Sequence, residues 1–137
     1  MKKFIADAWA ILALLQKEEP AASRVKQLLE DAQQEKLQIF VSTINLGEVY
    51  YRVGKVKGEA EAQKTLELIS RLSLKMLPAT DERVLAAAHW KIHHAISYAD
   101  AFAAAAAAEL KATLVTGDPE LESLKRKIRI EKLARLE

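Results

Sequence analysis

Short apolar runs, each about the length of a buried strand, recur along this chain and are separated by longer segments with helical spacing. Strands are predicted at residues 3–6, 37–41, 73–77, 113–116 and 128–130. Helices are predicted at residues 8–16, from Pro20 onward, and at 43–53, 59–72, 81–94 and 98–111. A further short helix is predicted after the turn at residues 117–119. Strands that alternate with helices build a mainly parallel sheet covered on both faces. The predicted fold class is α/β, a three-layer α/β/α sandwich with a mainly parallel central sheet.

Capping and breaking residues mark where these helices begin and end. Ser42 (or the threonine after it), Thr80 and Ser97 each precede a helical segment and are predicted N-caps. Gly54 and Gly58 are predicted to end the third helix.

The composition fits one globular domain and excludes some chemistry. The chain has 137 residues, of which 50% are hydrophobic and 29% charged, with a net charge of +2. No linker or repeat divides it, so residues 1–137 are expected to form a single domain. Because cysteine is absent, disulfides and thiolate metal sites are excluded. The small net charge gives no general basic field for nucleic acid, although a local basic face is left open.

The amino-terminal segment superficially resembles a secretory signal, with two lysines before an apolar stretch in MKKFIADAWAILALL. Asp7 interrupts that stretch, no small-residue cleavage site follows, and the stretch is too short to span a bilayer. A cytoplasmic protein without a membrane partner is therefore expected.

Four carboxylates, Asp7, Glu48, Asp100 and Asp118, stand among apolar or small residues. Acids are almost never buried unless they are paired, and a divalent metal ion pairs several at once. Asp7 directly follows the first predicted strand and Asp118 closely follows another, so both should lie at the carboxyl-end rim of a parallel sheet. Asp100 falls in the first turn of a helix, whereas Glu48 reaches this rim only if its helix leans over the sheet.

Such a cluster would suit Mg²⁺ or Mn²⁺, hard ions that take oxygen ligands and relieve the repulsion between carboxylates. These ions activate water and stabilise charge in phosphoryl displacement, so hydrolysis of a phosphodiester is the expected reaction. Each acid alone has a simpler reading. Asp7 and Asp118 could be N-caps, Asp100 a partner of the helix dipole, and Glu48 a solvated glutamate.

The segments around these four acids, in this order, resemble PIN domains of the VapC type, the toxin half of VapBC toxin–antitoxin pairs. The resemblance covers residues 4–124. The most specific are NLGEVYY around Glu48, SYADAFAAA around Asp100 and TGD at residues 116–118. Matched residue by residue, the resemblance implies that Asp7, Glu48, Asp100 and Asp118 form the metal site. It also implies that the hydroxyl of Thr116 supports the site or positions water.

The resemblance implies a Mg²⁺- or Mn²⁺-dependent endoribonuclease that cleaves RNA and thereby blocks translation. It further implies a homodimer and a cognate antitoxin that inserts a carboxyl-terminal peptide, often with a basic side chain, near the acidic site. Ala8 and Trp9 depart from the family, because many members have a serine or threonine there. Two rivals are left open: a PIN-like module that binds RNA or protein without cleavage, and a phosphodiesterase acting on DNA or small molecules.

Three other groups have two readings each. The segment AHWKIHH at residues 88–94 could stack on RNA bases, but core packing for Trp90 and solvated histidines are simpler, and no HExxH motif supports zinc. Arg52 is either an ion-pair partner of Glu48, one turn away, or a phosphate contact. The basic run at residues 125–129 is either a solvated strand edge or a contact for the RNA backbone.

Overall fold

The computed structural model describes residues 1–136. The elements in chain order are β1 (Lys2–Ala6), α1 (Ala8–Leu15), α2 (Ala21–Gln33), β2 (Leu37–Ser42), α3 (Thr43–Lys57), α4 (Glu59–Ser70), β3 (Lys75–Leu77), α5 (Asp81–His93), α6 (Tyr98–Leu110), β4 (Thr113–Thr116), α7 (Pro119–Glu122) and β5 (Arg129–Lys132).

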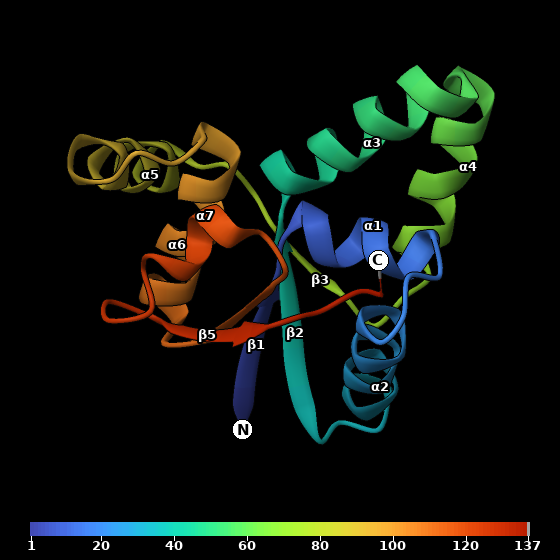
Figure 1. The fold of residues 1–137 in the computed structure, drawn as a ribbon, viewed down its shortest axis with the longest axis horizontal. Helices are drawn as coiled ribbons and strands as arrows, with labels where there is room; N and C mark the ends of the chain where they lie inside the picture. Colours follow the sequence, from blue (N-terminus) through green and yellow to red (C-terminus); the bar gives the residue numbers. More distant parts are fainter. Residues whose placement is uncertain (137) are drawn as a thin grey trace.

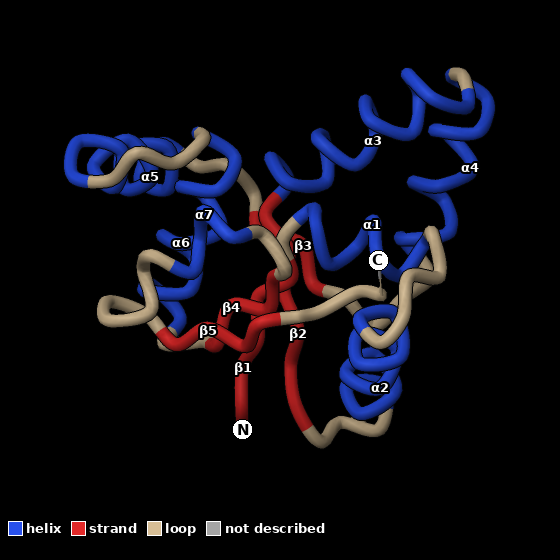
Figure 2. The backbone as a smooth tube through the Cα atoms, in the orientation of Figure 1, coloured by secondary structure: helices blue, strands red, loops and turns tan. Residues whose placement is uncertain are grey.

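The five strands form one sheet in the order β3-β2-β1-β4-β5, and every neighbouring pair is parallel. Helices flank the sheet on both sides, with α1 and α2 on one side and α5 and α6 on the other (Figure 1; Figure 2). The predicted α/β class and parallel sheet are therefore confirmed.

The period of two along β1 divides the core into two apolar layers. Phe4 and Ala6 pack in the layer with buried residues of α1 and α2, whereas Ile5 packs in the layer with α6. The alanine run of α6 is buried in this second layer, where small side chains let the helix approach the sheet closely.

One predicted helix end is wrong. Gly54 does not end α3, which continues to Lys57 before Gly58 closes it with a φ of 93°. A Cβ added at Gly54 would lie 3.7 Å from the Cβ of Ala62, so Gly54 faces α4 across a close helix–helix contact. Its small size therefore serves packing inside the helix rather than a break in it.

The parallel sheet gathers the carboxyl ends of its strands at one rim. The helices α1, α3 and α7 each start just after a strand ends there, so their positive dipole ends lie along this rim. Within the described chain, residues 1–136, no helix combines the length and the apolar character needed to cross a membrane.

Candidate metal centre

Asp7 lies at the carboxyl end of β1 with only 1% of its surface exposed. Its Oδ1 accepts a hydrogen bond from the backbone N–H of Ala10 at 2.9 Å, which makes Asp7 the N-cap of α1. Its other oxygen accepts a hydrogen bond from the hydroxyl of Thr116. Burial raises the pKa of Asp7 to about 7, although these two hydrogen bonds act to lower it.

Thr116 connects two of the predicted site acids. It stands at the end of β4, which pairs in parallel with β1 and places Val115 opposite Ala6. Besides donating to Asp7, its Oγ1 accepts a hydrogen bond from the backbone N–H of Asp118 at 3.0 Å. Asp118 in turn caps α7. The structure thus places Asp7 and Asp118 at the same rim, as the parallel sheet predicts.

Asp100 lies in the first turn of α6 and is 8% exposed. Its backbone N–H donates to the hydroxyl of Ser97, the helix N-cap, at 3.1 Å. Burial, followed by the negative charge of Asp118, raises the pKa of Asp100 to about 7. Hydrogen bonding to Ser97 opposes this shift, whereas the charge of Glu48 adds to it.

Glu48 of α3 lies near enough to Asp100 for its charge to raise the pKa of Asp100, a placement that the sequence left open. Glu48 also accepts a hydrogen bond from Arg52 Nε at 2.9 Å, so the ion-pair reading of Arg52 is the one found. One turn earlier, fully buried Asn45 donates its Nδ2 to the carbonyl of Ala99 at 3.1 Å. This bond ties α3 to the start of α6, and hence Glu48 to Asp100.

One acid of the site was not predicted. Ligand oxygens of Asp100, Asp118 and Glu120 lie within 4.8 Å of one another, whereas Asp7 and Glu48 are outside this group of three. Glu120 is exposed in the first turn of α7. Its position two residues after Asp118 was the available signal, but an acid in a first turn is common for helix-dipole reasons alone.

The donor set fits a hard divalent cation. Mg²⁺ and Mn²⁺ prefer carboxylate oxygens. Burial and repulsion between the acids raise the pKa of Asp7 and Asp100, and the charge of a bound dication would offset both costs of ionisation. One buried polar atom of α3 is unsatisfied: the Oδ1 of Asn45 has no hydrogen-bond partner within residues 1–136. A buried acceptor of this kind calls for a donor such as an ordered water.

Trp9 fills the position at which the sequence lacks the expected hydroxyl. A Cβ added at Gly117 would stand 2.2 Å from the indole ring, so the ring lies directly against the turn between Thr116 and Asp118. The guanidinium of Arg135 sits over the same ring, 5.6 Å from its centroid. Packing by Trp9 therefore supports this turn, together with the hydrogen bond from the backbone N–H of Asp118 to Thr116.

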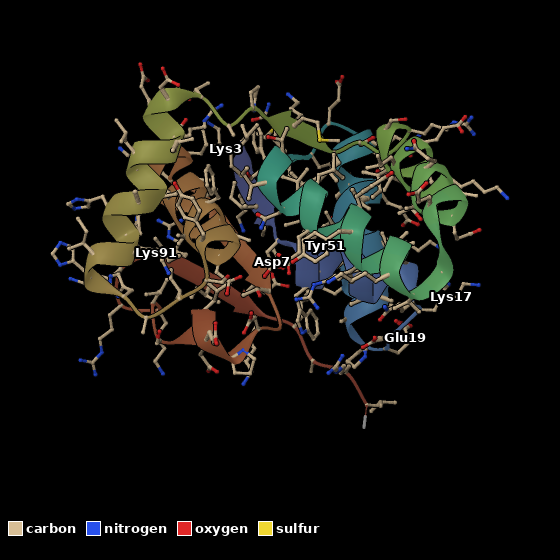
Figure 3. All side chains as sticks on the ribbon, turned by 90° about the horizontal axis from the view of Figure 1, so that it is seen from above. Lys3, Asp7, Lys17, Glu19, Tyr51 and Lys91 are labelled. Carbon is tan, nitrogen blue, oxygen red and sulfur yellow. The ribbon has the colours of Figure 1, made fainter. Side chains whose placement is uncertain are left out.

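A groove of about 870 Å³ lies beside the acids and is lined by α1, α3, α4 and Arg135. Trp9 and Arg52 line it, and each also contacts the acidic site, through Gly117 and Glu48 respectively. Figure 3 labels Asp7 near the centre of the view from above and Tyr51, another lining residue, on α3. The groove and the acids therefore share a wall.

The aromatic and histidine segment on α5 takes no part in this centre. Trp90 packs against the second apolar layer and stacks on His94 at 5.2 Å, which confirms the packing reading. His89 and His93 are exposed and meet edge to face at 5.2 Å. The group of side chains within residues 1–136 that could hold a metal ion consists of acids.

Comparison with known protein families matches residues 4–127 to the PIN domain. The chain belongs to the PIN-domain family. No curated protein matches the chain in sequence comparison.

Solved structures share this fold. VapBC2 from Rickettsia felis, bound to a DNA fragment from its promoter, aligns with a TM-score of 0.72 and 17% identity over 96% of this chain and 99% of that one. DNA-bound VapBC from Salmonella typhimurium gives 0.72 and 22% over 96% and 98%. The sarcin-ricin loop cleaving toxin VapC20 from Mycobacterium tuberculosis gives 0.69 and 16% over 88% and 93%. At these sequence identities the similarity shows a shared fold alone.

Proposed function

We propose that this PIN-domain protein is a divalent-metal-dependent endoribonuclease and the toxin of a type II toxin–antitoxin pair, acting on RNA in the cytoplasm to inhibit translation. The observation that carries the proposal is the convergence of buried Asp7 and Asp100 with Glu48, Asp118 and Glu120 at one rim. Buried like charges destabilise a fold, so their convergence favours a cationic ligand over a purely structural role.

The residues would divide the work as follows. Asp100, Asp118 and Glu120, with Asp7 and Glu48 around them, would hold Mg²⁺ or Mn²⁺. The bound ion would supply charge neutralisation and an activated water for phosphodiester hydrolysis. Thr116 keeps the Asp7 carboxylate oriented and fixes the backbone at Asp118.

Cleavage of a structured RNA by the purified protein, with Mg²⁺ or Mn²⁺ and with EDTA, tests this function. Asp7→Asn should lower the rate by about 10²–10³-fold, the scale for losing one preorganised electrostatic group. Asp81→Asn, an exposed acid in the first turn of α5, is the matched control and should cleave normally. Cleavage that survives both EDTA and Asp7→Asn would refute the metal mechanism.

The same assay separates the rivals. Tight RNA binding with no cleavage under either metal would support a binding module. Cleavage of single-stranded DNA or of a generic phosphodiester in preference to RNA would support a different phosphodiesterase.

An antitoxin is the proposed protein partner, because two of the structural neighbours are VapBC complexes. The groove suits an apolar segment of such a partner, since exposed Tyr51, Val56 and Leu68 line it. A basic side chain brought in with that segment would compete with Arg52 for Glu48. Val56→Glu should weaken capture of the partner encoded beside this gene, and unchanged capture would exclude the groove.

A homodimer is proposed as well. Leu85 and Ile92 lie two turns apart on α5 and are 69% and 74% exposed, an apolar pair without cover. Light scattering that gives the mass of one chain at all concentrations would refute this.

A further inference from the structure

The amino ends of β1, β4 and β5 border a hollow of about 770 Å³ that the proposed function does not use. Phe4, Thr113 and Arg129 lie side by side in the register of these three strands and line it. Arg24 of α2 forms another part of the wall and donates two hydrogen bonds to Glu131, at 2.7 and 2.9 Å. The hollow therefore lies at the opposite end of the strands from the acids.

Positive charge dominates this hollow. Glu131 is the single acid among its lining residues, and Arg24 already neutralises it. The remaining lining cations are Lys2, Lys3, Lys111 and Arg129. None of these four forms a salt bridge with a residue of the described chain, 1–136. Because the whole chain carries a net charge of only +2, this end of the molecule is much more basic than the rest.

We infer that this hollow is a second contact site for RNA, which binds backbone phosphates away from the acidic centre. Unpaired cations around a concave surface attract phosphate, whatever the base sequence. The choice of RNA among polyanions rests on the proposed function.

The shape of the basic surface favours a strand over a small anion. Lys125, Arg126 and Lys127 are exposed in the loop that leads into β5, so they add positive charge just before Arg129. The inference includes this run as an RNA contact, one of the two readings that the sequence left open. A single small anion would use only part of this extended surface.

The position of the hollow makes it selective for long substrates. Lys3, a cation that lines the hollow, lies four residues before Asp7 along β1, about 13 Å at roughly 3.3 Å per residue. An RNA that occupies both ends must span at least that distance. Short oligonucleotides should therefore reach the acids without reaching the hollow.

Salt-dependent RNA binding tests the inference without cleavage. Fluorescence anisotropy of a labelled single-stranded RNA in EDTA, over a series of salt concentrations, compares wild type with Lys3→Ala/Lys111→Ala/Arg129→Ala. The matched control is Lys17→Ala/Lys64→Ala/Arg71→Ala, which removes the same charge from α4, its C-cap residue and the loop after α1. Thermal unfolding checks that each variant folds, and glutamine at the same positions replaces alanine where it does not.

Loss of three phosphate contacts should flatten the slope of log affinity against log salt by about 2 and weaken binding by at least about tenfold at low salt. The control should change the slope far less. Equal losses in both triple variants would overturn the inference. So would an unchanged slope with impaired binding of the protein partner, which would assign the hollow to a protein.

The two proposals fail separately. RNA bound as expected but never cleaved would refute the ribonuclease and leave the second contact site standing. An active ribonuclease whose hollow variant binds RNA like the control would do the reverse.

Discussion

The two ends of the parallel strands carry opposite charge in opposite surroundings. At the carboxyl ends, Asp7 and Asp100 are buried. Asp7 accepts hydrogen bonds from Thr116 and Ala10, and the backbone N–H of Asp100 donates to Ser97. At the amino ends, Lys2, Lys111 and Arg129 are exposed around an open hollow. Both ends gather like charges, but only the acids are removed from water.

This difference decides what each end responds to. Burial makes ionisation of the acids costly, so their state depends on protons and on a dication. Exposed cations keep their hydration and are screened by salt, so the basic end should respond mainly to ionic strength. This contrast agrees with the two proposals, metal-dependent hydrolysis at the acidic rim and contact with RNA phosphates, whatever the base sequence, at the basic hollow.

The largest expected effect is a loss of stability with rising pH in the metal-free protein. Asp7 and Asp100 have a pKa of about 7 when folded, against an ordinary value of 3.8. The folded state therefore holds more protons than the unfolded state between these values. Their contribution to stability is complete below about pH 4 and is lost as pH rises through about 7, by roughly 2–4 kcal/mol.

Urea unfolding in EDTA at pH 5, 6, 7 and 8 measures this loss, and Mn²⁺ at pH 8 should restore stability by binding the folded state. Asp7→Asn should flatten the profile, whereas Asp81→Asn should keep it. A wild-type profile that is flat or rises with pH would contradict the burial argument.

The sequence predicted the elements that depend on local signals and missed those that depend on contact. Asp7 and Asp118 could be placed at one rim, because each follows a strand of a parallel sheet. Glu48 could not, since the path of α3 over the rim depends on packing such as the bond from Asn45 to Ala99. The prediction that Glu48 belongs to the site came instead from the motif NLGEVYY, through its resemblance to VapC-type PIN domains.

Other features had no local signal at all. The sequence predicts Gly54 to break a helix, but the structure packs Gly54 against Ala62 of α4. The contact between Trp9 and Gly117 joins two distant parts of the chain, and the hollow brings together residues of β1, β4, β5, α2 and α6. Tertiary packing decides such features, and propensity does not encode it.

A smaller effect is expected when the link between Asp7 and Asp118 is cut. Thr116→Val removes the hydroxyl that donates to Asp7 and accepts from the backbone of Asp118. Groups that support metal ligands typically change affinity or activity by about 10–100-fold, and a loss of this size in Mn²⁺ affinity is expected by calorimetry. Thr116→Ser keeps the hydroxyl and should retain most of the affinity. Equal losses in both variants would show that the methyl group, through packing, is what matters.

The smallest effect tests the packing that stands where a hydroxyl was expected. Gly117→Ala brings a Cβ to 2.2 Å from the indole of Trp9, so the ring or the turn must move. Overpacking of this kind costs about 1–3 kcal/mol of unfolding free energy. Gly47→Ala is the control, because nothing lies within 4 Å of its added Cβ in α3 and alanine favours the helix by about 0.5–1 kcal/mol.

Removal of the ring separates the two causes. In Trp9→Ala/Gly117→Ala the clash is gone, so the cost of Gly117→Ala should largely disappear when it is measured in the Trp9→Ala background. Urea unfolding of the four proteins of this cycle gives the coupling free energy, and contacting residues typically show about 0.5–3 kcal/mol. Additive costs would contradict the packing argument, because they would mean that the ring of Trp9 does not press on the turn that bears Asp118.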